Sequence, residues 1–316
     1  MNSPQISQGP EPPAGLPPCE SPDAWVFLTD DSGKITAHAA LWWKETPFLE
    51  GQRICTIGAF SATSPEAAAA ILAEGCARLR DRGCTVAVGP MNGNTWQPHR
   101  FVIESDGRGP YLLEPRNPPA YSGWWEQAGF MVLSRYSSSV MPLDGTEATT
   151  PAFHDRLKKS GVHTRTFDLS RFDEDLAVIH RLSLDSFSRN FLYTPQDEAA
   201  FIRAYRKVKD AIDPGFVRIA ERGGQPCGFA FGIEDKEALA RGEKPALIVK
   251  TLSVDPSSRS AGLGSMLVDE LHQAAREKGL VEAIHAMQNE SNSSLKITGR
   301  HHGKVFRRYA LYSKLL

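Results

Sequence analysis

The stretch that decides the fold reads Leu252-Ser253-Val254-Asp255-Pro256-Ser257-Ser258-Arg259-Ser260-Ala261-Gly262-Leu263-Gly264-Ser265-Met266-Leu267. Its first residues indicate the end of a buried strand, and its last residues begin an amphipathic helix. Between them, Arg-x-x-Gly-x-Gly forms a turn in which glycines let backbone N–H groups approach an anion closely. The helix N-terminus adds unpaired donors and the positive end of its dipole, and Arg259 adds a charge. The segment therefore predicts a pyrophosphate-binding turn.

The glycine spacing alone is a weak signal, because Gly107-Arg108-Gly109 repeats it without an evident strand before it or helix after it. An arginine three residues before Gly262, a preceding Val-x-Pro and a following helix strengthen the second copy. A glycine-rich turn without a ligand is the alternative. Taken together, the segment resembles the acetyl-CoA loop of the GCN5-related N-acetyltransferase (GNAT) superfamily, whose signature is Gln/Arg-x-x-Gly-x-Gly/Ala.

This resemblance covers residues from about 164 to 316. It implies acetyl-CoA as co-substrate, with the pyrophosphate on backbone N–H groups and the pantetheine arm along the preceding strand. The cofactor-binding residues that it implies are Leu252, Ser253, Val254, Arg259, Ser260, Ala261, Gly262, Leu263, Gly264, Ser265 and Asn292. Asn292 either binds the pantetheine arm or caps the helix that follows it.

The usual tail of the family, Asn-x-x-Ala-x-x-x-Tyr-x-Lys-x-Gly-Phe, is only partly present. Counted from Asn289, the tyrosine position falls on Lys296, and no Gly-Phe follows. In the family this tyrosine commonly protonates the departing thiolate. Tyr309 and Tyr312 are the candidate replacements by residue type, and ordinary strand residues are the alternative. A strand places these two tyrosines on opposite faces.

Transfer to an amine also requires a base, because a free alkyl amine has a pKa of about 10. Glu290 is the candidate catalytic base, and His285 is the alternative. Lys250 is a poor base unless it is buried. In the family, the segment that contains Phe191 and Tyr193 covers the acceptor pocket, so these two aromatic residues are the candidate substrate contacts, with packing as the alternative.

The first half repeats the order of elements of the second half: hairpin, strand, helix, strand, helix, strand. It lacks the cofactor loop, because Phe60-Ser61-Ala62-Thr63 leads directly to a helix capped by Ser64. Its Trp125-Glu126-Gln127-Ala128-Gly129-Phe130 resembles the tail of the family with tryptophan in place of tyrosine. Asn92, Trp96, Arg100 and Glu114 either face the acceptor site or a partner, or build turns and core.

We therefore predict a mixed α/β (α+β) fold with two GNAT-like domains of the acyl-CoA N-acyltransferase type. The expected divisions are a disordered tail over 1–22, a degenerate domain without a CoA loop over 23–142, a linker over 143–162 and a catalytic domain over 163–316. Only one strand follows the helix near Asn292, where this fold usually has two. We expect the two halves to share sheet edges or exchange a strand, and not to fold separately.

Composition excludes several classes of protein. The 316 residues hold 36 Lys and Arg against 37 Asp and Glu, a formal net charge of −1, which argues against a nucleic-acid or anionic-membrane binder. The longest apolar stretch, Ala67–Ala73, is too short to span a bilayer, and the start lacks the pattern of a secretion signal. Five scattered cysteines without a CxxC pair predict a reduced, cytoplasmic protein. His301-His302 lacks ligand-spaced partners, so no metal site is expected.

The resulting hypothesis is an N-acetyltransferase that moves an acetyl group from acetyl-CoA to a primary amine of a small molecule by direct attack. The alternatives are a longer acyl group, a CoA-binding regulatory or scaffold protein without turnover, and an interaction module built on the tryptophan-rich first half. The sequence leaves the oligomeric state open, with a homo-oligomer among the options.

Overall fold

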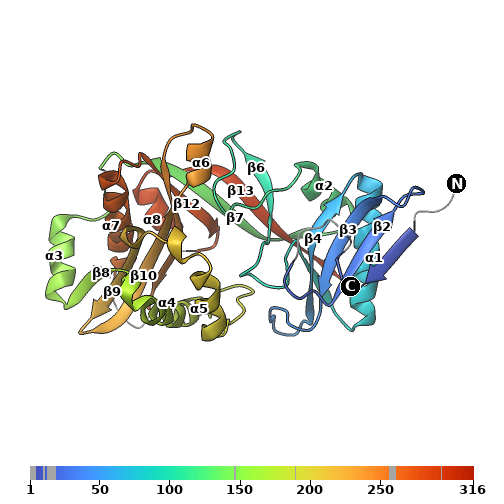
Figure 1. The fold of residues 1–316 in the computed structure, drawn as a ribbon, viewed down its shortest axis with the longest axis horizontal. Coiled ribbons are helices and arrows are strands. Elements are labelled where there is room, and N and C mark those ends of the chain that lie inside the picture. Colours follow the sequence, from blue (N-terminus) through green and yellow to red (C-terminus); the bar gives the residue numbers. More distant parts are fainter. Residues whose placement is uncertain are drawn as a thin grey trace.

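The computed structural model describes residues 5–9, 11–12, 19–145, 147–188, 190–255, 261–292 and 294–316. Two lobes lie side by side along the long axis of the molecule (Figure 1). Two long strands run between them, β7 (Met131–Pro142) and β13 (Lys304–Leu315). Thirteen strands belong to one sheet, twelve of them in the order β1-β2-β3-β4-β5-β13-β7-β12-β11-β10-β9-β8, with β6 paired to β13.

The first lobe contains β1 (Gln5–Gly9), β2 (Ala24–Thr29), β3 (Ile35–Trp42), β4 (Ile54–Ala62), α1 (Pro65–Asp81), β5 (Val86–Gly89), β6 (Phe101–Ser105) and α2 (Ala120–Gln127). The β2–β3 turn is fixed by the Asp30 carboxylate, which accepts hydrogen bonds from the backbone of Ser32 and Lys34. Helix α1 begins as the sequence predicts, because Ser64 accepts a hydrogen bond from the Ala67 N–H. The expected hairpin and helix are confirmed.

The second lobe contains α3 (Pro151–Lys159), β8 (Val162–Thr166), α4 (Phe172–Phe187), α5 (Glu198–Arg206), β9 (Val217–Arg222), β10 (Gln225–Glu234), α6 (Lys236–Ala240), β11 (Ala246–Val254), α7 (Leu263–Glu277), β12 (Glu282–Asn289) and α8 (Leu295–Arg300). Short 3-10 turns cover Leu169–Arg171, Lys209–Ala211 and Pro214–Phe216. One apolar core surrounds α1 in the first lobe, and another surrounds α7 in the second.

The two halves exchange their last strands. Strand β7 ends the first half, yet it pairs with β12 of the second half through residues such as Ser139, opposite His285. Strand β13 ends the second half, yet it pairs with β5 of the first half, with Tyr312 opposite Gly89. The two exchanged strands also pair with each other along most of their length. The expectation that the halves share sheet edges is confirmed.

Two expected divisions need correction. Part of the predicted disordered tail, residues 5–9, forms β1 and pairs antiparallel with β2. Edge pairing uses backbone hydrogen bonds and requires no apolar periodicity, so the composition of this segment did not predict it. The predicted linker over 143–162 contains α3, which is capped by Thr150 and anchored by the buried Leu157. An amphipathic helix of nine residues is too short to be recognised from the sequence pattern.

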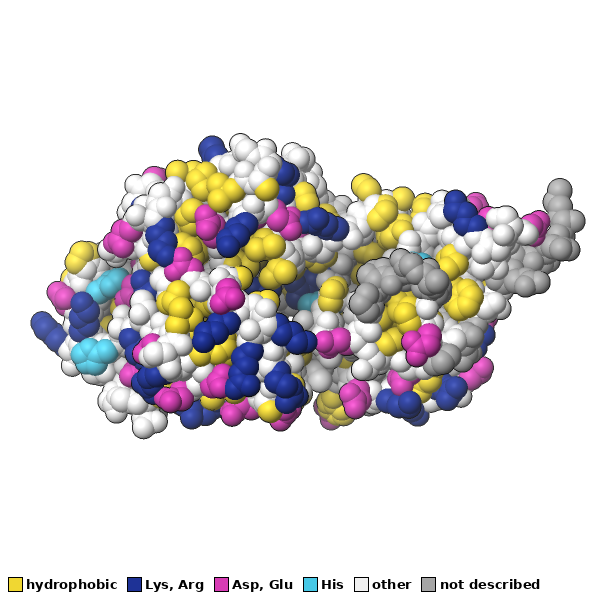
Figure 2. Space-filling view, in the orientation of Figure 1, with side chains coloured by type: hydrophobic (Ala, Val, Ile, Leu, Met, Phe, Trp, Pro, Cys, Tyr) yellow, Lys and Arg dark blue, Asp and Glu magenta, His cyan; other side chains and the backbone are white. Residues whose placement is uncertain are grey.

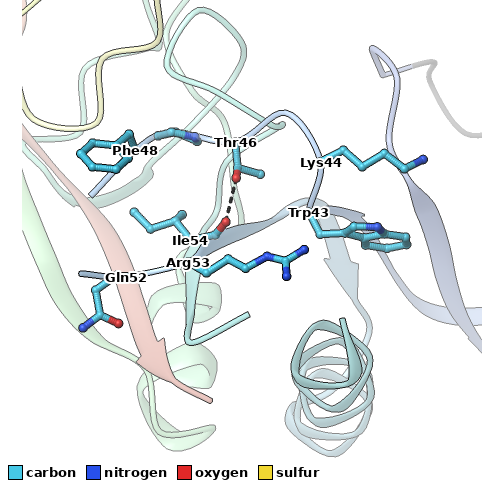
Figure 3. Close-up of a pocket in the computed structure, with 8 residues that line it drawn as sticks. Trp43, Lys44, Thr46, Phe48, Gln52, Arg53 and Ile54 are labelled. Atoms are coloured by element: carbon cyan, nitrogen blue, oxygen red, sulfur yellow. Dashed lines mark hydrogen bonds between the residues drawn. The ribbon is translucent and has the colours of Figure 1, made fainter. Parts of the chain in front are cut away.

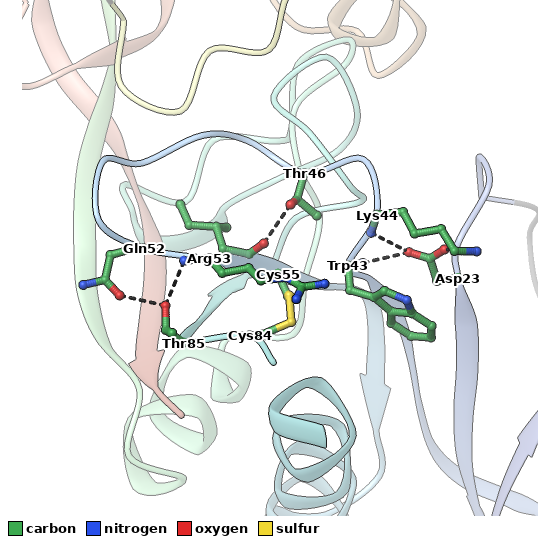
Figure 4. Close-up of a disulfide and its surroundings, with 10 residues drawn as sticks. Asp23, Trp43, Lys44, Thr46, Gln52, Arg53, Cys55, Cys84 and Thr85 are labelled. Carbon is green, nitrogen blue, oxygen red and sulfur yellow. Dashed lines mark hydrogen bonds and ion pairs between the residues drawn. A yellow bond between two sulfur atoms is a disulfide. The ribbon is translucent and has the colours of Figure 1, made fainter. Parts of the chain in front are cut away.

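The expectation of fully reduced cysteines was wrong. Cys55 of β4 and Cys84, just before β5, form a disulfide across neighbouring strands (Figure 4). Cys19, Cys76 and Cys227 are free. The pair lies 29 residues apart in the sequence without a motif, and only the parallel pairing of β4 with β5 brings the two side chains together. Within the described residues, every helix is too short or too polar to cross a bilayer.

Candidate functional site

The candidate site opens where two parallel strands separate. Strands β11 and β12 pair only from Ala246–Val249 to Glu282–His285. Beyond Val249, β11 keeps β10 on one edge as far as Val254, and β12 keeps β7 on its outer edge. Among the described strands, none pairs with the other edge of residues 250–254. The backbone groups on this edge are therefore available to an extended ligand.

A bulge marks the start of the separation on β11. Strand β10 pairs Phe231 with Thr251 and Gly232 with Val249, so Lys250 is the extra residue. A bulge bends its strand and redirects the side chain of the extra residue. The pairing of β12 with β7 is irregular at the same level, where Met287 has a φ of +47° and its N–H donates to Ser138 Oγ at 2.8 Å.

The far end of this edge leads to the start of α7. Gly262 precedes the helix with a φ of +88°, a conformation that only glycine adopts freely. A Cβ on Gly264 would meet Ile297 Cδ1 at 3.3 Å and Leu252 Cδ2 at 3.5 Å, so this glycine allows the helix to approach the strand. Arg259 and Ser260 lie outside the described residues. The N–H groups of the first helical turn and the dipole of α7 suit a pyrophosphate.

An aromatic ring that the sequence did not predict lies against this turn. A Cβ placed on Gly262 would come within 2.3 Å of Phe153 Cζ, from α3. Phe153 packs against the same apolar core as α7, and Arg156 stacks on it at 4.8 Å. Gly262 is thus required by protein packing as well as by any bound anion. An anion at this turn would reach the helix N–H groups beside the ring of Phe153.

The side chains of several predicted cofactor residues are engaged in contacts within the protein, which leaves their backbone groups for a ligand. The Ser253 hydroxyl is buried and donates to the Leu182 carbonyl at 3.1 Å, and the Ser265 hydroxyl accepts from Arg300 Nη1 at 2.9 Å. Leu263 is fully buried. Asn292 Oδ1 accepts from the Ser294 N–H at 3.2 Å, which is the turn-forming alternative for this residue. Leu252, Val254 and Ala261 are partly exposed or exposed along the open edge and turn.

The candidate acids and base do not come together. Tyr312 lies in the core of the first lobe against Phe101, with its hydroxyl 3.2 Å from Glu126 Oε1, and burial raises its pKa to about 12. This placement removes Tyr312 from the site. Glu290, just past β12, forms an ion pair with Arg308.

Tyr309 occupies a different place, the seam between the lobes. It is fully buried, and its hydroxyl donates to the Glu114 carboxylate and lies 2.9 Å from Ser138 Oγ. Burial raises the pKa of Tyr309, and the nearby Tyr111 and Glu114 raise it further. Ser138 Oγ also accepts from the Met287 N–H, so Ser138 links Tyr309 to the point where β12 separates from β11.

The two predicted substrate aromatics differ in environment. Phe191 is 39% exposed. Tyr193 packs against Trp96 of the first lobe, with ring centroids 5.9 Å apart, and Trp96 Nε1 donates to the Thr194 carbonyl at 2.7 Å. The first lobe therefore closes one side of the segment that was expected to cover the acceptor. Trp96 is a contact between lobes, whereas the Asn92 side chain accepts from the Ala59 N–H of β4 at 2.7 Å, a contact within the first lobe.

Comparison with known proteins agrees with this geometry. Residues 176–296 match the acetyltransferase (GNAT) family model, from within α4 to the start of α8. This segment of the chain is a GNAT-family segment. Members of this family transfer acyl groups from CoA thioesters to amines. The open edge of β11 and the turn at Gly262 lie inside the matched segment.

The similar proteins cover different shares of this chain. A bacterial ceramide synthase of Caulobacter vibrioides (strain NA1000 / CB15N) is 27% identical over 166 residues, which is 51% of this chain. The match spans only 43% of that relative. The GCN5-related N-acetyltransferase of Sphaerobacter thermophilus superposes with a TM-score of 0.57 and 14% identity, covering 92% of this chain and 80% of that one.

A tandem GNAT protein from the clavulanic acid biosynthesis pathway superposes with a TM-score of 0.55 and 13% identity, covering 92% of this chain and 82% of that one. At these identities the likeness establishes the fold alone. The chain has the mixed-sheet acyl-CoA N-acyltransferase fold, and its arrangement resembles tandem GNAT structures.

A group of basic side chains beside the GNAT strand separation was not predicted as a unit. Arg100 follows His99 in the first lobe and stacks on Tyr136 of β7 at 3.8 Å. The charge of Arg100 lowers the pKa of Lys250, after the larger effect of desolvation by surrounding protein. Burial, Arg100 and Lys250 lower the pKa of His99 to about 3. Figure 2 shows a hollow between the lobes with Lys and Arg side chains around it.

A second hollow lies in the first lobe, away from the strand separation. Its lining comes from the loop between β3 and β4 and the start of β4: Trp43, Lys44, Thr46, Pro47, Phe48, Gln52, Arg53 and Ile54 (Figure 3). Thr46 donates to the Ile54 carbonyl across it at 2.7 Å. This hollow is wide open, and the candidate GNAT residues do not line it.

Proposed function

We propose that this protein is a CoA-dependent N-acyltransferase that moves an acetyl group to a primary amine of a small molecule by direct attack. The observation that carries the proposal is the unpaired edge of residues 250–254, which begins at the bulge at Lys250 and ends beside the first turn of α7, where Gly264 approaches Leu252 and Val254. This edge suits an extended arm, and the turn suits the phosphates at its end. Acetyl-CoA supplies an activated acyl group when it is bound.

The residues of this chain then have separate tasks. The backbone of Leu252–Val254 aligns the pantetheine arm, and the first turn of α7 holds the pyrophosphate, with Arg259 as a further charge. The thioester end of the bound acyl-CoA would then lie near Lys250, where β11 and β12 separate. Proximity and oriented backbone dipoles supply much of the rate, because a thiol of pKa about 8.5 leaves readily.

The amine must arrive neutral. The positive charges of Arg100 and Lys250 disfavour an ammonium group beside them, which lowers the pKa of the incoming amine. The role of Glu290 as base stays a prediction, and its ion pair with Arg308 would have to open first. The proton of Tyr309 is engaged by Glu114, so we assign Tyr309 a structural role at the seam.

A longer acyl group is the second candidate. The relationship to a protein named bacterial ceramide synthase supports it, because that name describes N-acylation in lipid synthesis. The cofactor turn does not distinguish the two, since it contacts only the CoA portion shared by all such donors.

The test is calorimetric titration with acetyl-CoA and palmitoyl-CoA, followed by detection of thiol release with a panel of amines. Arg259→Gln removes the positive charge of the turn. The matched control is Arg276→Gln, which removes a positive charge at the other end of α7. We expect wild type and Arg276→Gln to bind alike, and Arg259→Gln to bind about tenfold more weakly. A substitution at Gly262 would be a poorer test, because its side chain would collide with Phe153.

The outcomes separate the candidates. Thiol release with acetyl-CoA supports acetyl transfer, and release only with palmitoyl-CoA supports the longer acyl group. Binding without release across the panel would favour a regulatory protein. A folded wild type that binds neither donor would end the transferase proposal.

A further inference from the structure

Two cations from different halves of the chain meet beside the strand separation. Arg100 lies between the first-lobe strands β5 and β6, with a φ of +80°, and its N–H donates to the Pro90 carbonyl at 2.9 Å. This uncommon backbone conformation is held by the fold. The guanidinium lies 3.8 Å from the centroid of the Tyr136 ring. Lys250 projects from the bulge of β11.

Neither cation has an acidic partner in the described part of the chain. No carboxylate there lies within ion-pair distance of Arg100 or Lys250, and Arg100 Nε is buried without a hydrogen-bond partner. The groups that act on the pKa of Lys250 are the surrounding protein and Arg100, and no carboxylate is among them. His99 has a buried Nε2 without a hydrogen-bond partner beside them.

The nearby carboxylates are committed elsewhere. Glu114 accepts from the Tyr309 hydroxyl and lies 3.3 Å from Arg307 Nε, with its side chain fully buried. Glu290 is paired with Arg308. The positive charge of Arg100 and Lys250 is thus not neutralised by these carboxylates.

Uncompensated charge in a partly buried position is costly unless a partner arrives. A guanidinium held on an aromatic ring presents its remaining N–H groups to planar oxyanions such as carboxylate, and it also suits phosphate. Lys250 reaches solvent, so a ligand can enter. The combination indicates an anion site.

We propose that Arg100 and Lys250 bind an anionic oxygen group, a carboxylate or a phosphate, that the amine acceptor carries near its amine. The inference rests on the proposed transferase function and names the class of acceptor. It gives the first lobe a part in the site, since Arg100 comes from the half that lacks the cofactor turn.

The phosphates of CoA are a less suitable occupant. Val254 lies four positions after Lys250, and a strand rises about 3.3 Å per residue, so roughly 13 Å lie between Lys250 and the end of β11. The pyrophosphate belongs beyond that end, at α7. Arg100 and Lys250 therefore lie toward the thioester, where the acceptor must react.

The experiment uses product analogues, so that binding is measured without turnover. One pair is N-acetylglycine and its neutral amide, and the other is N-acetyl-O-phosphoethanolamine and N-acetylethanolamine. Each is titrated by calorimetry into the full chain in the presence of CoA. The variants are Arg100→Gln and Lys250→Met. Arg82→Gln is the matched control, because Arg82 also stacks on an aromatic ring, that of Trp43, at 4.6 Å in the first lobe.

We expect the anionic member of at least one pair to bind tenfold or more tightly than its neutral partner. This ratio should fall toward one in Arg100→Gln and Lys250→Met, and stay unchanged in Arg82→Gln. The pair that shows the larger ratio distinguishes carboxylate from phosphate. Circular dichroism verifies that each variant is folded.

Equal binding within both pairs, no binding by any analogue, or an unchanged ratio in both variants would overturn the inference. Thiol release with amines of either charge would then leave the transferase function standing. Conversely, a charge ratio that depends on Arg100 in a protein that never releases CoA would support the anion site and contradict the transferase function.

Discussion

The hydroxyls of Tyr111 and Tyr309 lie 3.0 Å apart, although 198 residues separate them in the sequence. Both hydroxyls also contact Ser138 Oγ at 2.9 Å, so three segments meet at one buried point. The Tyr309 hydroxyl also donates a hydrogen bond to the Glu114 carboxylate. Buried polar networks of this kind specify one arrangement, because any misalignment leaves polar groups unpaired. The seam between the lobes is therefore a specific contact.

Removing one hydroxyl from this network tests that conclusion. Tyr309→Phe leaves the buried Glu114 carboxyl with one donor fewer, and we expect the free energy of unfolding to fall by about 1–3 kcal/mol. Tyr312→Phe is the control, since its hydroxyl lies outside this network, 3.2 Å from Glu126 Oε1. Its expected loss is about 1 kcal/mol or less. Urea unfolding of both variants measures the difference, and equal losses would argue against a special role for the seam.

Much of the fold follows from local pattern. The Ser64 cap and the glycines at 262 and 264 fix their elements through short-range geometry, and these predictions agree with the structure. The exchange of β7 and β13 was inferred from a missing strand rather than from a pairing signal. Strand β1 was not predicted, because pairing at a sheet edge requires only backbone groups and leaves no pattern of side chains.

The site was less predictable than the fold. The cofactor turn is contiguous in the sequence, whereas Arg100 and Lys250 come from different halves of the chain and only the fold brings their charges near each other. Phe153 covers Gly262 from a helix that the pattern did not show. Tyr309 and Tyr312 were grouped by residue type. They lie three positions apart on one strand, yet they pack in different apolar clusters.

The strand exchange predicts that the halves are interdependent. A fragment of residues 150–316 lacks β7, which lies between β13 and β12 in the full chain. We expect this fragment to be insoluble or to unfold without cooperativity. Co-expression with residues 19–149 should restore a soluble complex, because both exchanged strands are then present. A stable, cooperative 150–316 fragment would contradict the prediction.

The disulfide should be measurable in the purified protein. Alkylation of the denatured chain without reductant should label three cysteines, and five after reduction. The bridge closes a loop of 29 residues, and the chain-entropy model gives about 3.5 kcal/mol for that length. We therefore expect Cys55→Ala/Cys84→Ala to unfold at lower urea than wild type. Labelling of all five thiols before reduction would show that the bridge is absent.

Two buried histidines in the second lobe, His272 and His285, should make the protein sensitive to acid. His285 Nδ1 lies 2.8 Å from Thr298 Oγ1, and Thr298 donates to Gln288 Oε1 at 2.7 Å. His285 therefore donates through Nδ1 and accepts through Nε2 from His272 Nε2, at 3.2 Å. This arrangement requires the ring of His285 to be neutral, because its Nε2 must be unprotonated to accept. The ring of His301 lies 4.5 Å from that of His272.

Burial lowers the pKa of His285 to about 3 and that of His272 well below its usual value, with the charges of His301 and Arg276 adding to the effect. In the unfolded chain both titrate near pH 6.5. Below that pH the unfolded state binds more protons, so stability falls as pH decreases from about 6.5 toward 3. Each such histidine contributes up to about 1.4 kcal/mol per pH unit.

Urea unfolding at several pH values between 4.5 and 8 checks this dependence. His272→Phe removes one titrating ring, and we expect the slope of stability against pH below 6.5 to decrease by about one proton. His163→Gln, at an exposed position of β8, is the control and should keep the wild-type slope. The same slope in His272→Phe and wild type would show that His272 is not held neutral by the fold.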